Sequence, residues 1–470
     1  MEDLPPPLLI DILSRLPDSA DLARCRLVSK TLNASSYEVH SLSHFCTCSR
    51  YRKYRSRNDN PLAPSPPSPP FKSVFCNLVR NSRRLESVAI GVDKSLGRKS
   101  YDEVEDDGDD LYLTDVTFMA EWIPAIGGGL RSLSISDFWS QSSWRRSNAL
   151  ALISSCCYNL VELELKNAWL SVDGLKIMPK LTNFTLEYVR LDDEDLNKVN
   201  GCFPGLEVLN LVGVGGLNEP KIDLMNLKIC HWTVSNAPTS LTILAPNLVE
   251  LKLECVRPRS LVLETPSLSD LHLTIEKADN LKVKDIPSLT SLQLAAGDLH
   301  SLMGMFRSSR AVKTLAVDIL KSSEWVTPML KLDMFFDYFP NVIFLELGNA
   351  AWSKMASLEI EAFFSPEGYE HRVEINGLKE ITARLVVDDI GTDLPLVASI
   401  VRRCANLSGF GLLIHREVDP SVASKFIWKC CARWPRVRWR WGIWKEGTQD
   451  SWHVNCNCLK HEENSSAEVD

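Results

Sequence analysis

The chain of 470 residues is long enough for several ordinary domains, or for one elongated repeat body with appendages. Its net charge of −8 excludes a global basic field that would attract nucleic acid, and its apolar share of 45% is that of a folded protein. No apolar run reaches the roughly 18 to 20 residues of a membrane helix, the N-terminus is acidic where a signal peptide is basic, and 14 cysteines are ordinary for a reduced protein of this length. We therefore expect a protein of the cytoplasm or nucleus that binds neither a membrane nor nucleic acid.

Residues 1–45 form the first predicted module, which contains three short helical pieces. The first piece carries an apolar stripe at helical spacing, made of Leu8, Leu9, Ile12, Leu13 and Leu16. Pro17 ends this helix, and Asp18 or Ser19 can cap the next one. Because a module of about 40 residues is near the size limit for independent stability, we expect part of its apolar surface to be buried by a partner.

Residues 46–70 are predicted to be a linker that separates the helical module from a second body. The basic stretch CSRYRKYRSR comes first, and the Pro-rich stretch NDNPLAPSPPSPP follows it. So much proline is incompatible with the interior of a helix or sheet, which favours an extended connection. The basic stretch is interpreted as a solvated helix end, with a nuclear signal or a phosphate contact as the alternative. A second interruption, YDEVEDDGDD at 101–110, is predicted to be a solvated acidic loop.

Residues 71–445 are dominated by one repeated pattern, L-x-x-L-x-L, which is often preceded by proline as in APNLVELKLECV at 245–256. The leading positions follow one another at intervals of 20 to 25 residues, at Leu160, Leu181, Leu206, Leu227, Leu248, Leu268, Leu289 and Val312. Weaker units begin at Leu85, Leu130, Val342, Leu378 and Leu407. This period is typical of leucine-rich repeats, in which short parallel strands point alternate leucines into a continuous core. The predicted fold is α/β: a small all-helical module followed by a leucine-rich-repeat horseshoe (solenoid) of about a dozen irregular repeats.

The prolines of the repeats are interpreted as strand starts, because a residue without a backbone N–H suits the entry of a strand. Pro246, Pro266 and Pro287 are the clearest cases. The asparagine that follows the strand in many leucine-rich repeats is largely absent here, so the turns must satisfy their backbone groups in another way.

The end of the repeat body is predicted to alternate between strands and helices and to close in a C-terminal cap, followed by a polar tail at 446–470. Residues 393–407 and 421–435 show helical periodicity, and residues 437–447 read as the closing strand. Alternation in that strand places Trp439 and Trp441 on the core face and Arg438 and Arg440 on the other. A capping strand is favoured over a nucleic-acid surface, and an arginine face for an acidic partner stays open as the alternative.

The residues between the leucines of each strand point away from the core and are the candidate target-binding surface. They are Glu162, Glu164, Asn183, Thr185, Glu250, Lys252, Asp270, His272, Gln293 and Glu346. Their mixed, mainly acidic character suggests a protein or peptide target with basic groups. The alternative is a solvated face, with binding on the loops instead.

Metal, cofactor and catalytic sites are not predicted. HSLSHFCTC at 40–48 and HVNCNCLKH at 453–461 pair their cysteines as C-x-C, which is a poor tetrahedral chelate, so thiols in the core or on the surface are favoured over zinc. The phosphate-loop, nucleophile-elbow and H-E-x-x-H motifs are missing from the sequence. We therefore expect no metal, no cofactor and no enzymatic activity.

The N-terminal module resembles an F-box. The resemblance rests on Leu4-Pro5, on the helix LLIDILSRLP and on DLARCRLVSKTLN, which together cover about a tenth of the chain. Joined to leucine-rich repeats, the module resembles the plant F-box/leucine-rich-repeat proteins. Two positions depart from the family pattern: Pro7 stands where Glu is common, and Leu32 or Asn33 stands where Trp is frequent.

The resemblance implies a substrate adaptor of an SCF-type ubiquitin ligase, in which the F-box docks on the Skp linker subunit and, through it, on a cullin. The repeats would hold an unknown target protein. The positions that the resemblance assigns to the Skp interface are Leu4, Pro5, Leu8, Leu9, Ile12, Leu13, Leu16, Pro17, Leu22, Val28 and Leu32. Three alternatives stay open: a helical cap without a partner, a repeat scaffold that acts without a ligase, and a small-molecule receptor supported by an inositol phosphate. The last would require a cluster of inward Lys and Arg side chains.

Overall fold

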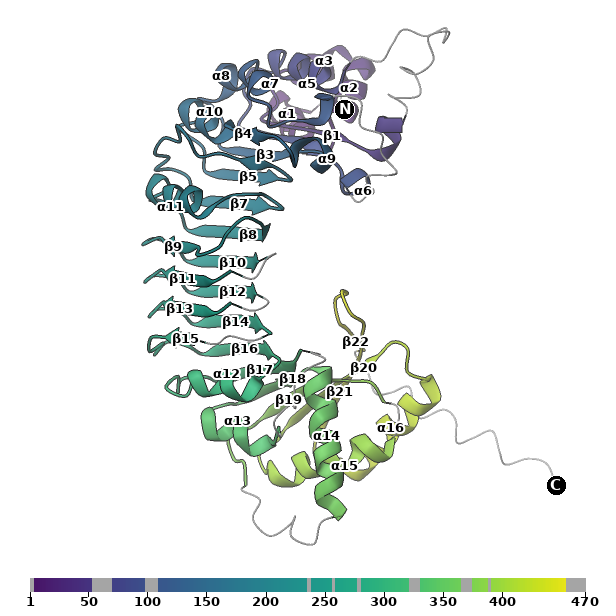
Figure 1. The fold of residues 1–470 in the computed structure, drawn as a ribbon. Coiled ribbons are helices and arrows are strands. Elements are labelled where there is room, and N and C mark those ends of the chain that lie inside the picture. Colours follow the sequence, from purple (N-terminus) through teal and green to yellow (C-terminus); the bar gives the residue numbers. More distant parts are fainter. Residues whose placement is uncertain are drawn as a thin grey trace, which may run out of the picture. The chain divides into compact units, whose positions relative to one another are not determined.

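The computed structural model describes residues 4–52, 70–97, 109–234, 238–255, 258–276, 280–320, 330–364, 374–387 and 390–453. The chain divides into two compact units, Met1–Leu248 and Val249–Asp470. Each unit contains a run of parallel strands, drawn in Figure 1. No helix in the described ranges is long and apolar enough to cross a membrane.

The N-terminal module contains the three predicted helices, α1 (Pro6–Ser14), α2 (Ser19–Val28) and α3 (Lys30–Ser35). The Asp18 carboxylate caps α2 by accepting a hydrogen bond from the Ala20 N–H at 3.0 Å. The Ser29 hydroxyl caps α3 by accepting from the Leu32 N–H at 3.1 Å. Both caps satisfy donors that the first turn of a helix leaves unpaired. The predicted helical character of this module is confirmed.

The first strand of the repeat sheet lies earlier in the chain than predicted. β1 (Ser41–Cys46) pairs in parallel with β2 (Ser87–Val92), and residues 48–52 are helical. The boundary predicted at residue 45 therefore falls inside a strand, and the stretch at 46–70 interrupts the sheet instead of separating two bodies. The strand escaped notice because its inward residues are Leu42, His44 and Cys46 rather than three leucines. Residues 53–69 and 101–108, which hold most of the predicted linker and acidic loop, lie outside the described residues.

The parallel strands of the N-terminal unit pair in the order of the chain. They are β1, β2, β3 (Ser132–Ser136), β5 (Glu162–Lys166), β7 (Asn183–Glu187), β8 (Val208–Val214) and β10 (Ile229–Val234). The segments that return from one strand to the next include α5 (Phe71–Arg80), α6 (Lys94–Gly97), η2 (Asp109–Leu111), α7 (Val116–Ala120), α8 (Ile123–Ile126), α9 (Trp139–Ser142), α10 (Ala149–Cys156) and α11 (Asp193–Cys202). Short strands serve the same purpose at β4 (Arg146–Ser147), β6 (Trp169–Leu170), β9 (Lys221–Asp223) and β11 (Ser240–Leu244).

The C-terminal unit continues the same plan. Its parallel strands are β12 (Glu250–Cys255), β14 (Asp270–Ile275), β16 (Ser291–Ala296), β17 (Thr314–Ile319), β18 (Phe344–Leu347), β19 (Glu380–Leu385), β20 (Gly409–His415) and β21 (Arg438–Trp444). Its return segments include β13 (Ser260–Glu264), β15 (Asn280–Val283), α12 (Leu299–Met305), α13 (Leu332–Tyr338), α14 (Asn349–Phe364), α15 (Ile390–Arg403) and α16 (Pro420–Arg433). β22 (Ser451–His453) pairs antiparallel with β21, so the cap extends into the stretch predicted as a polar tail. Residues 454–470 lie outside the described residues. This is the leucine-rich-repeat solenoid that the sequence predicts.

Repeat length decides how the chain returns between strands. Repeats of 20 or 21 residues, such as those that begin at Leu227, Leu248 and Leu268, return through the short strands β11, β13 and β15. A strand advances about 3.3 Å per residue and a helix about 1.5 Å, so a helix needs roughly twice as many residues for the same distance. The longer repeats at either end of the solenoid have room for α10, α15 and α16.

The prolines of the repeats occupy turns, not strand entries, so the interpretation given above is wrong. In APNLVELKLECV the Leu248 N–H donates to the Ala245 carbonyl at 3.1 Å, which places Pro246 at the second position of a β-turn. β12 begins only at Glu250. The same bond closes the turns around Pro266 and Pro287. Proline favours this position because its fixed φ matches the turn.

Asparagines that precede the leading residue connect successive turns. Asn247, just before Leu248, donates through its side-chain amide to the Met225 carbonyl at 2.8 Å. In each such case the acceptor lies two residues before the leading residue of the preceding repeat. The donors are Asn159, Asn226, Asn247, Asn341 and Asn406, with distances of 2.8 to 2.9 Å. The ladder therefore stabilises the turns that precede the strands, not the turns that follow them.

Candidate partner-binding surfaces

The first helix has two apolar faces with opposite environments. Leu9 and Leu13 are buried in the module, whereas Leu8 and Ile12 remain 51% and 46% exposed. Both pairs are four residues apart, so each occupies its own face of α1. One face therefore holds the module together, and the other presents apolar side chains to water.

The end of α2 carries a second exposed apolar pair. Leu27 is 88% exposed and Val28 is 72% exposed, although the same helix buries Leu22. Leu27 is not among the residues predicted for the interface. The signal that could have found it is its position directly beside Val28, which was predicted. We call Leu4, Leu8, Ile12, Leu27 and Val28 the exposed apolar set of the module.

The residues predicted for the Skp interface divide into two groups. Those exposed to solvent are Leu4, Pro5, Leu8, Ile12, Pro17 and Val28, and Leu16 is half-buried. Those buried within the module are Leu9, Leu13, Leu22 and Leu32. The buried group can support an interface only by shaping the module, whereas the exposed group is free to touch a partner.

Polar contacts fix the module to the first strand of the sheet. His44 of β1 is buried, and its Nδ1 lies 2.6 Å from the Ser19 hydroxyl at the start of α2. Its ring stacks on Phe71 with centroids 4.3 Å apart. Asp18 pairs with Arg50 at 2.8 Å beside it. Burial above all, and then the nearby Arg50 charge, lowers the pKa of His44 to about 4, so the ring is neutral at physiological pH.

The outward residues of the N-terminal unit are largely engaged with one another. Lys166 pairs with Glu164 at 2.9 Å and with Glu187 at 2.8 Å, and the Ser134 hydroxyl donates to Glu164 at 2.6 Å. The pKa of Glu164 is lowered by its hydrogen bonds from Ser134 and Lys166, which outweigh its partial burial. Glu162 is exposed, and Asn183 is half-buried beside it in the register of the sheet.

The remaining outward residues of this unit form a polar row. Thr185 accepts a hydrogen bond from the Asn210 side-chain amide at 3.0 Å. Both are half-buried on neighbouring strands. All four candidates on this unit, Glu162, Glu164, Asn183 and Thr185, alternate with buried residues as predicted.

The outward residues of the C-terminal unit differ in their exposure and in the contacts that they make. Glu250, Asp270 and Gln293 are exposed, and Lys252 pairs with Glu254 at 3.1 Å. His272 lies 3.2 Å from the Thr274 hydroxyl, and burial lowers the pKa of its ring. Glu346 pairs with Arg384 at 2.7 Å. The outward orientation of these candidates is as predicted, and their role in target binding stays a prediction.

Comparison with known proteins identifies the family. Residues 1–49 match the F-box-like family model. An F-box/LRR-repeat protein of Arabidopsis thaliana is 47% identical over 458 residues, which cover 96% of this chain and 100% of that relative. The chain belongs to the F-box/LRR-repeat protein family. Its N-terminal helices are therefore an F-box, and the exposed apolar set lies on that F-box.

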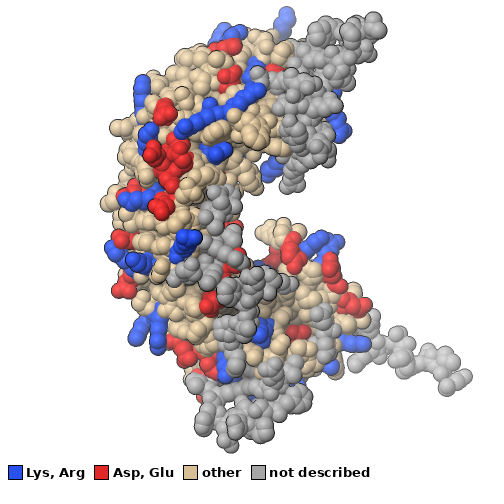
Figure 2. Space-filling model, viewed as in Figure 1, with Lys and Arg blue, Asp and Glu red and all other residues tan. Residues whose placement is uncertain are grey.

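Charges of both signs are interspersed on the visible face of this F-box/LRR-repeat protein, as Figure 2 shows.

Among the described residues no group of three or more His, Cys, Asp or Glu side chains could hold a metal ion. Burial raises the pKa of Cys46 to about 12, so its thiol stays protonated. Cys456, Cys458 and His461 lie outside the described residues. Arg403 is buried, and it pairs with Asp333.

Proposed function

We propose that this F-box/LRR-repeat protein is the substrate-recognition adaptor of an SCF-type ubiquitin ligase. The F-box docks on the Skp linker subunit, which connects it to a cullin, and the repeats capture a target protein. The observation that carries this proposal is the exposed apolar set. Leu8, Ile12, Leu27 and Val28 are each about half exposed or more, next to a tightly buried core.

The energy of docking follows from burying these side chains. Complete burial of one Leu, Ile or Val side chain is worth about 1.5–3 kcal/mol. Four such residues supply a hydrophobic centre of the kind found in stable interfaces, even after the cost of association is subtracted. The F-box is small and gains most from such a partner.

The adaptor acts by proximity and performs no chemistry of its own. A target held by the repeats near the ubiquitin-conjugating enzyme reacts at a raised effective concentration. The protein functions in the cytoplasm or the nucleus, which imaging of a fluorescent fusion tests.

The test compares two double variants of the full-length chain, each with charges on a different exposed surface. Leu8→Asp with Ile12→Asp places two charges on the exposed face of α1 and leaves Leu9 and Leu13 in place. We expect binding to the purified Skp linker subunit to be lost. The matched control is Ile177→Asp with Met225→Asp, two residues of the repeats that are 66% and 64% exposed, and it should bind as the wild type does.

The full chain is needed because β1 pairs with β2, so a fragment that ends near residue 57 would leave that strand unpaired. Charges at Leu13 would unfold the module instead of blocking its surface, since Leu13 is buried. A wild-type chain that does not bind the Skp subunit contradicts the adaptor proposal and favours a repeat scaffold that acts without a ligase.

A further inference from the structure

The last strands of the sheet carry a second layer on their outward side. β20 is buried on both faces, including the outward residues Gly409, Gly411 and Leu413. The covering group is the side chain of Trp452 in β22, which pairs with β21 in the same sheet and places Trp452 opposite Gly442. The outward side of these strands is therefore not an open polar surface like that of β12 and β14.

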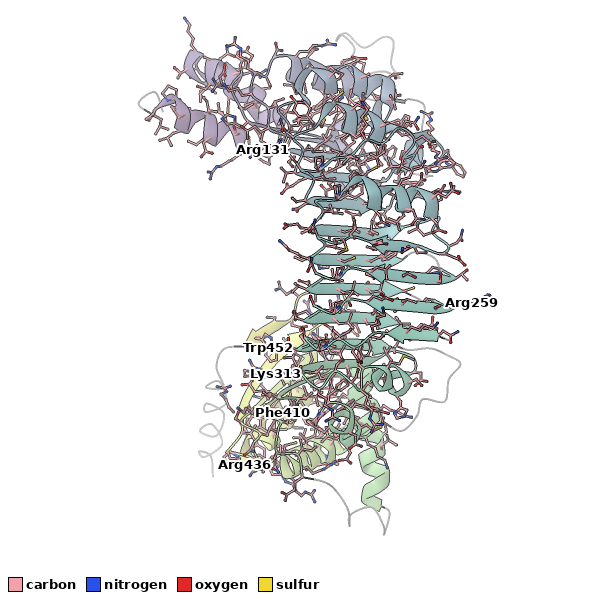
Figure 3. The ribbon with its side chains drawn as sticks, turned by 90° about the vertical axis from the view of Figure 1, so that its left-hand side faces the viewer. Arg131, Arg259, Lys313, Phe410, Arg436 and Trp452 are labelled. Atoms are coloured by element: carbon pink, nitrogen blue, oxygen red, sulfur yellow. The ribbon has the colours of Figure 1, made fainter. Side chains whose placement is uncertain are left out.

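Two glycines allow Trp452 to lie directly on the sheet. A Cβ atom at Gly411 would lie 3.0 Å from Cη2 of Trp452, and one at Gly442 would lie 3.2 Å from its Cε3. Side chains at either position would push the indole away. Trp452 nevertheless stays 39% exposed, so its outer face is available. Figure 3 labels Trp452 together with Phe410, the inward residue of β20.

Ion pairs hold the hairpin of β21 and β22 in this position. Asp450, just before β22, pairs with Arg384 of β19 at 2.8 Å, and Arg384 also pairs with Glu346 of β18 at 2.7 Å. The hydrogen bond that Arg384 donates to the Asp450 carboxylate raises the pKa of Arg384, so the guanidinium stays charged despite its partial burial. These ion pairs link β18, β19 and the residue before β22, so they hold Trp452 in place in the absence of a partner.

Two arginine side chains share one carboxylate beside the indole. Arg438 and Arg440 of β21 lie 2.8 Å and 3.5 Å from the same carboxylate, Glu380. Both arginine side chains are about half exposed or more, so a partner can reach them. The Arg440 guanidinium lies 5.3 Å from the centre of the Trp452 ring.

A second exposed aromatic residue completes the surface. Phe344 of β18 is 44% exposed and points outward. It stands in one row with Glu380, Gly409 and Arg438 across β18 to β21. We call Phe344, Arg438, Arg440 and Trp452 the aromatic–arginine platform.

We propose that the aromatic–arginine platform is the docking site for the target, and that it takes an extended segment with an acidic side chain next to a large apolar one. This inference rests on the adaptor function proposed above and adds the chemistry of the target. Tryptophan and arginine are the residues that most often dominate binding energy in protein interfaces. The half-exposed guanidinium groups of Arg438 and Arg440 can each form charge-assisted hydrogen bonds with a carboxylate of the target, whereas they repel a nearby basic side chain. Since the platform is held in place by ion pairs, little ordering cost opposes binding.

The test uses the purified full-length chain and fluorescent peptides of about eight residues, long enough when extended to cross four strands about 4.8 Å apart. One series places Asp or Glu next to Phe, Leu or Trp, and a matched series replaces only the acid with Lys. We expect fluorescence anisotropy to detect the acidic series alone. Arg440→Glu and Trp452→Ser should each weaken binding about tenfold or more, as expected for central interface residues.

The control is Lys425→Glu, a charge reversal at an exposed residue of α16 outside the platform, which should leave binding unchanged. Arg438→Glu provides a second test if Trp452→Ser disturbs the hairpin, because the Arg438 side chain is 68% exposed. Preference for the Lys series, no preference, or binding that is insensitive to the platform variants would overturn the proposal. Binding of the Skp subunit is measured separately with the same variants and should not change, so each of the two proposals can fail alone.

Discussion

At the scale of single residues, the asparagine ladder is a testable source of stability. Asn247 bonds to the Met225 carbonyl at 2.8 Å, and Asn247→Ala removes this bond while leaving the buried Leu248 untouched. Because Asn247 is exposed, water can replace part of the lost interaction, and we expect a loss of about 0.5–1 kcal/mol. The measurement is the shift of the urea unfolding midpoint. The control is Ser267→Ala at the same position before Leu268, which should change stability by less, and equal losses from both variants would contradict the ladder.

The sequence predicts which residues face the core more reliably than it predicts how the turns close. Leu248, Leu251 and Leu253 are buried as expected, since alternation along a strand depends only on local geometry. Pro246 was assigned to the wrong place because proline suits both a strand entry and the second position of a β-turn. The ladder asparagine was visible in the sequence, but its acceptor lies on another repeat.

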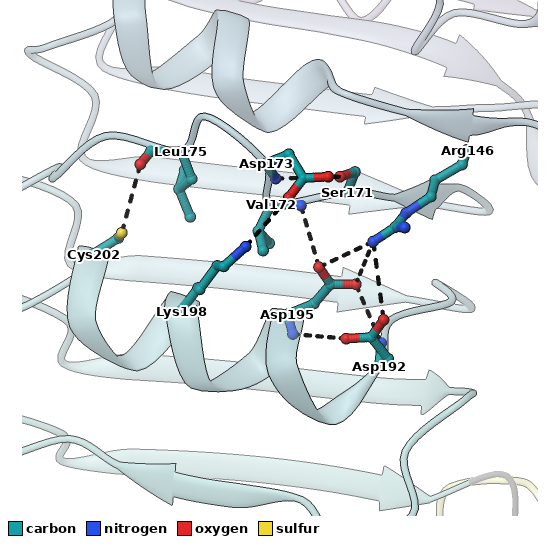
Figure 4. A network of polar contacts seen from close by, with 9 residues as sticks. All are labelled: Arg146, Ser171, Val172, Asp173, Leu175, Asp192, Asp195, Lys198 and Cys202. Carbon is teal, nitrogen blue, oxygen red and sulfur yellow. Dashed lines mark hydrogen bonds and ion pairs between the residues drawn. The ribbon is translucent and has the colours of Figure 1, made fainter.

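At the scale of elements, the start of α11 depends on a buried carboxylate, shown in Figure 4. Asp195 is buried in the first turn of α11, and both of its oxygens lie 3.3 Å from the Arg146 guanidinium. Arg146→Met keeps the aliphatic stem and removes the charge, so Asp195 loses its cation; we expect a loss of about 1–3 kcal/mol in the free energy of unfolding. Lys198→Met is the control, because Lys198 and Asp173 form an exposed pair at 3.2 Å that solvent screens, so its loss should change stability little. The measurement is the thermal unfolding of both variants. Similar losses of stability in the two variants would show that the Asp195 carboxylate does not need Arg146 as a partner.

Elements were predictable where periodicity was long and apolar. α15 buries Leu396, Val397 and Ile400, and α16 buries Phe426 and Cys430. The return strands β11, β13 and β15 were not predicted, since a stretch of five residues gives too few positions for periodicity to be recognised. β22 and its contact with Gly411 depend on residues far apart in the chain, so the aromatic–arginine platform could not be assembled from the sequence.

At the scale of the whole molecule, the F-box and the first repeats share one joint. The buried His44 contacts Ser19 of the F-box and stacks on Phe71 of α5, while Asp18 and Arg50 pair beside it. Neither the linker prediction nor the family resemblance indicates this joint. An adaptor holds the target at a defined position relative to the ligase, so a rigid contact between the F-box and the first repeats serves the proposed function.

The joint predicts a specific dependence of stability on pH. The folded-state pKa of His44, about 4, lies below its usual value of 6.5, so the neutral ring stabilises the folded protein fully above pH 6.5 and this contribution is lost as the pH falls toward 4. Full loss amounts to roughly 3 kcal/mol. His44→Phe keeps the aromatic packing and cannot be protonated. As the pH falls from 6.5 toward 4, the unfolding midpoint of the wild type should therefore fall relative to that of the variant. Asp137, whose pKa burial raises to about 7, titrates with the opposite sign but is present in both proteins and cancels in the difference. A difference that stays constant between pH 7 and pH 4 would show that His44 is protonated in the folded state and that the joint does not depend on its neutrality.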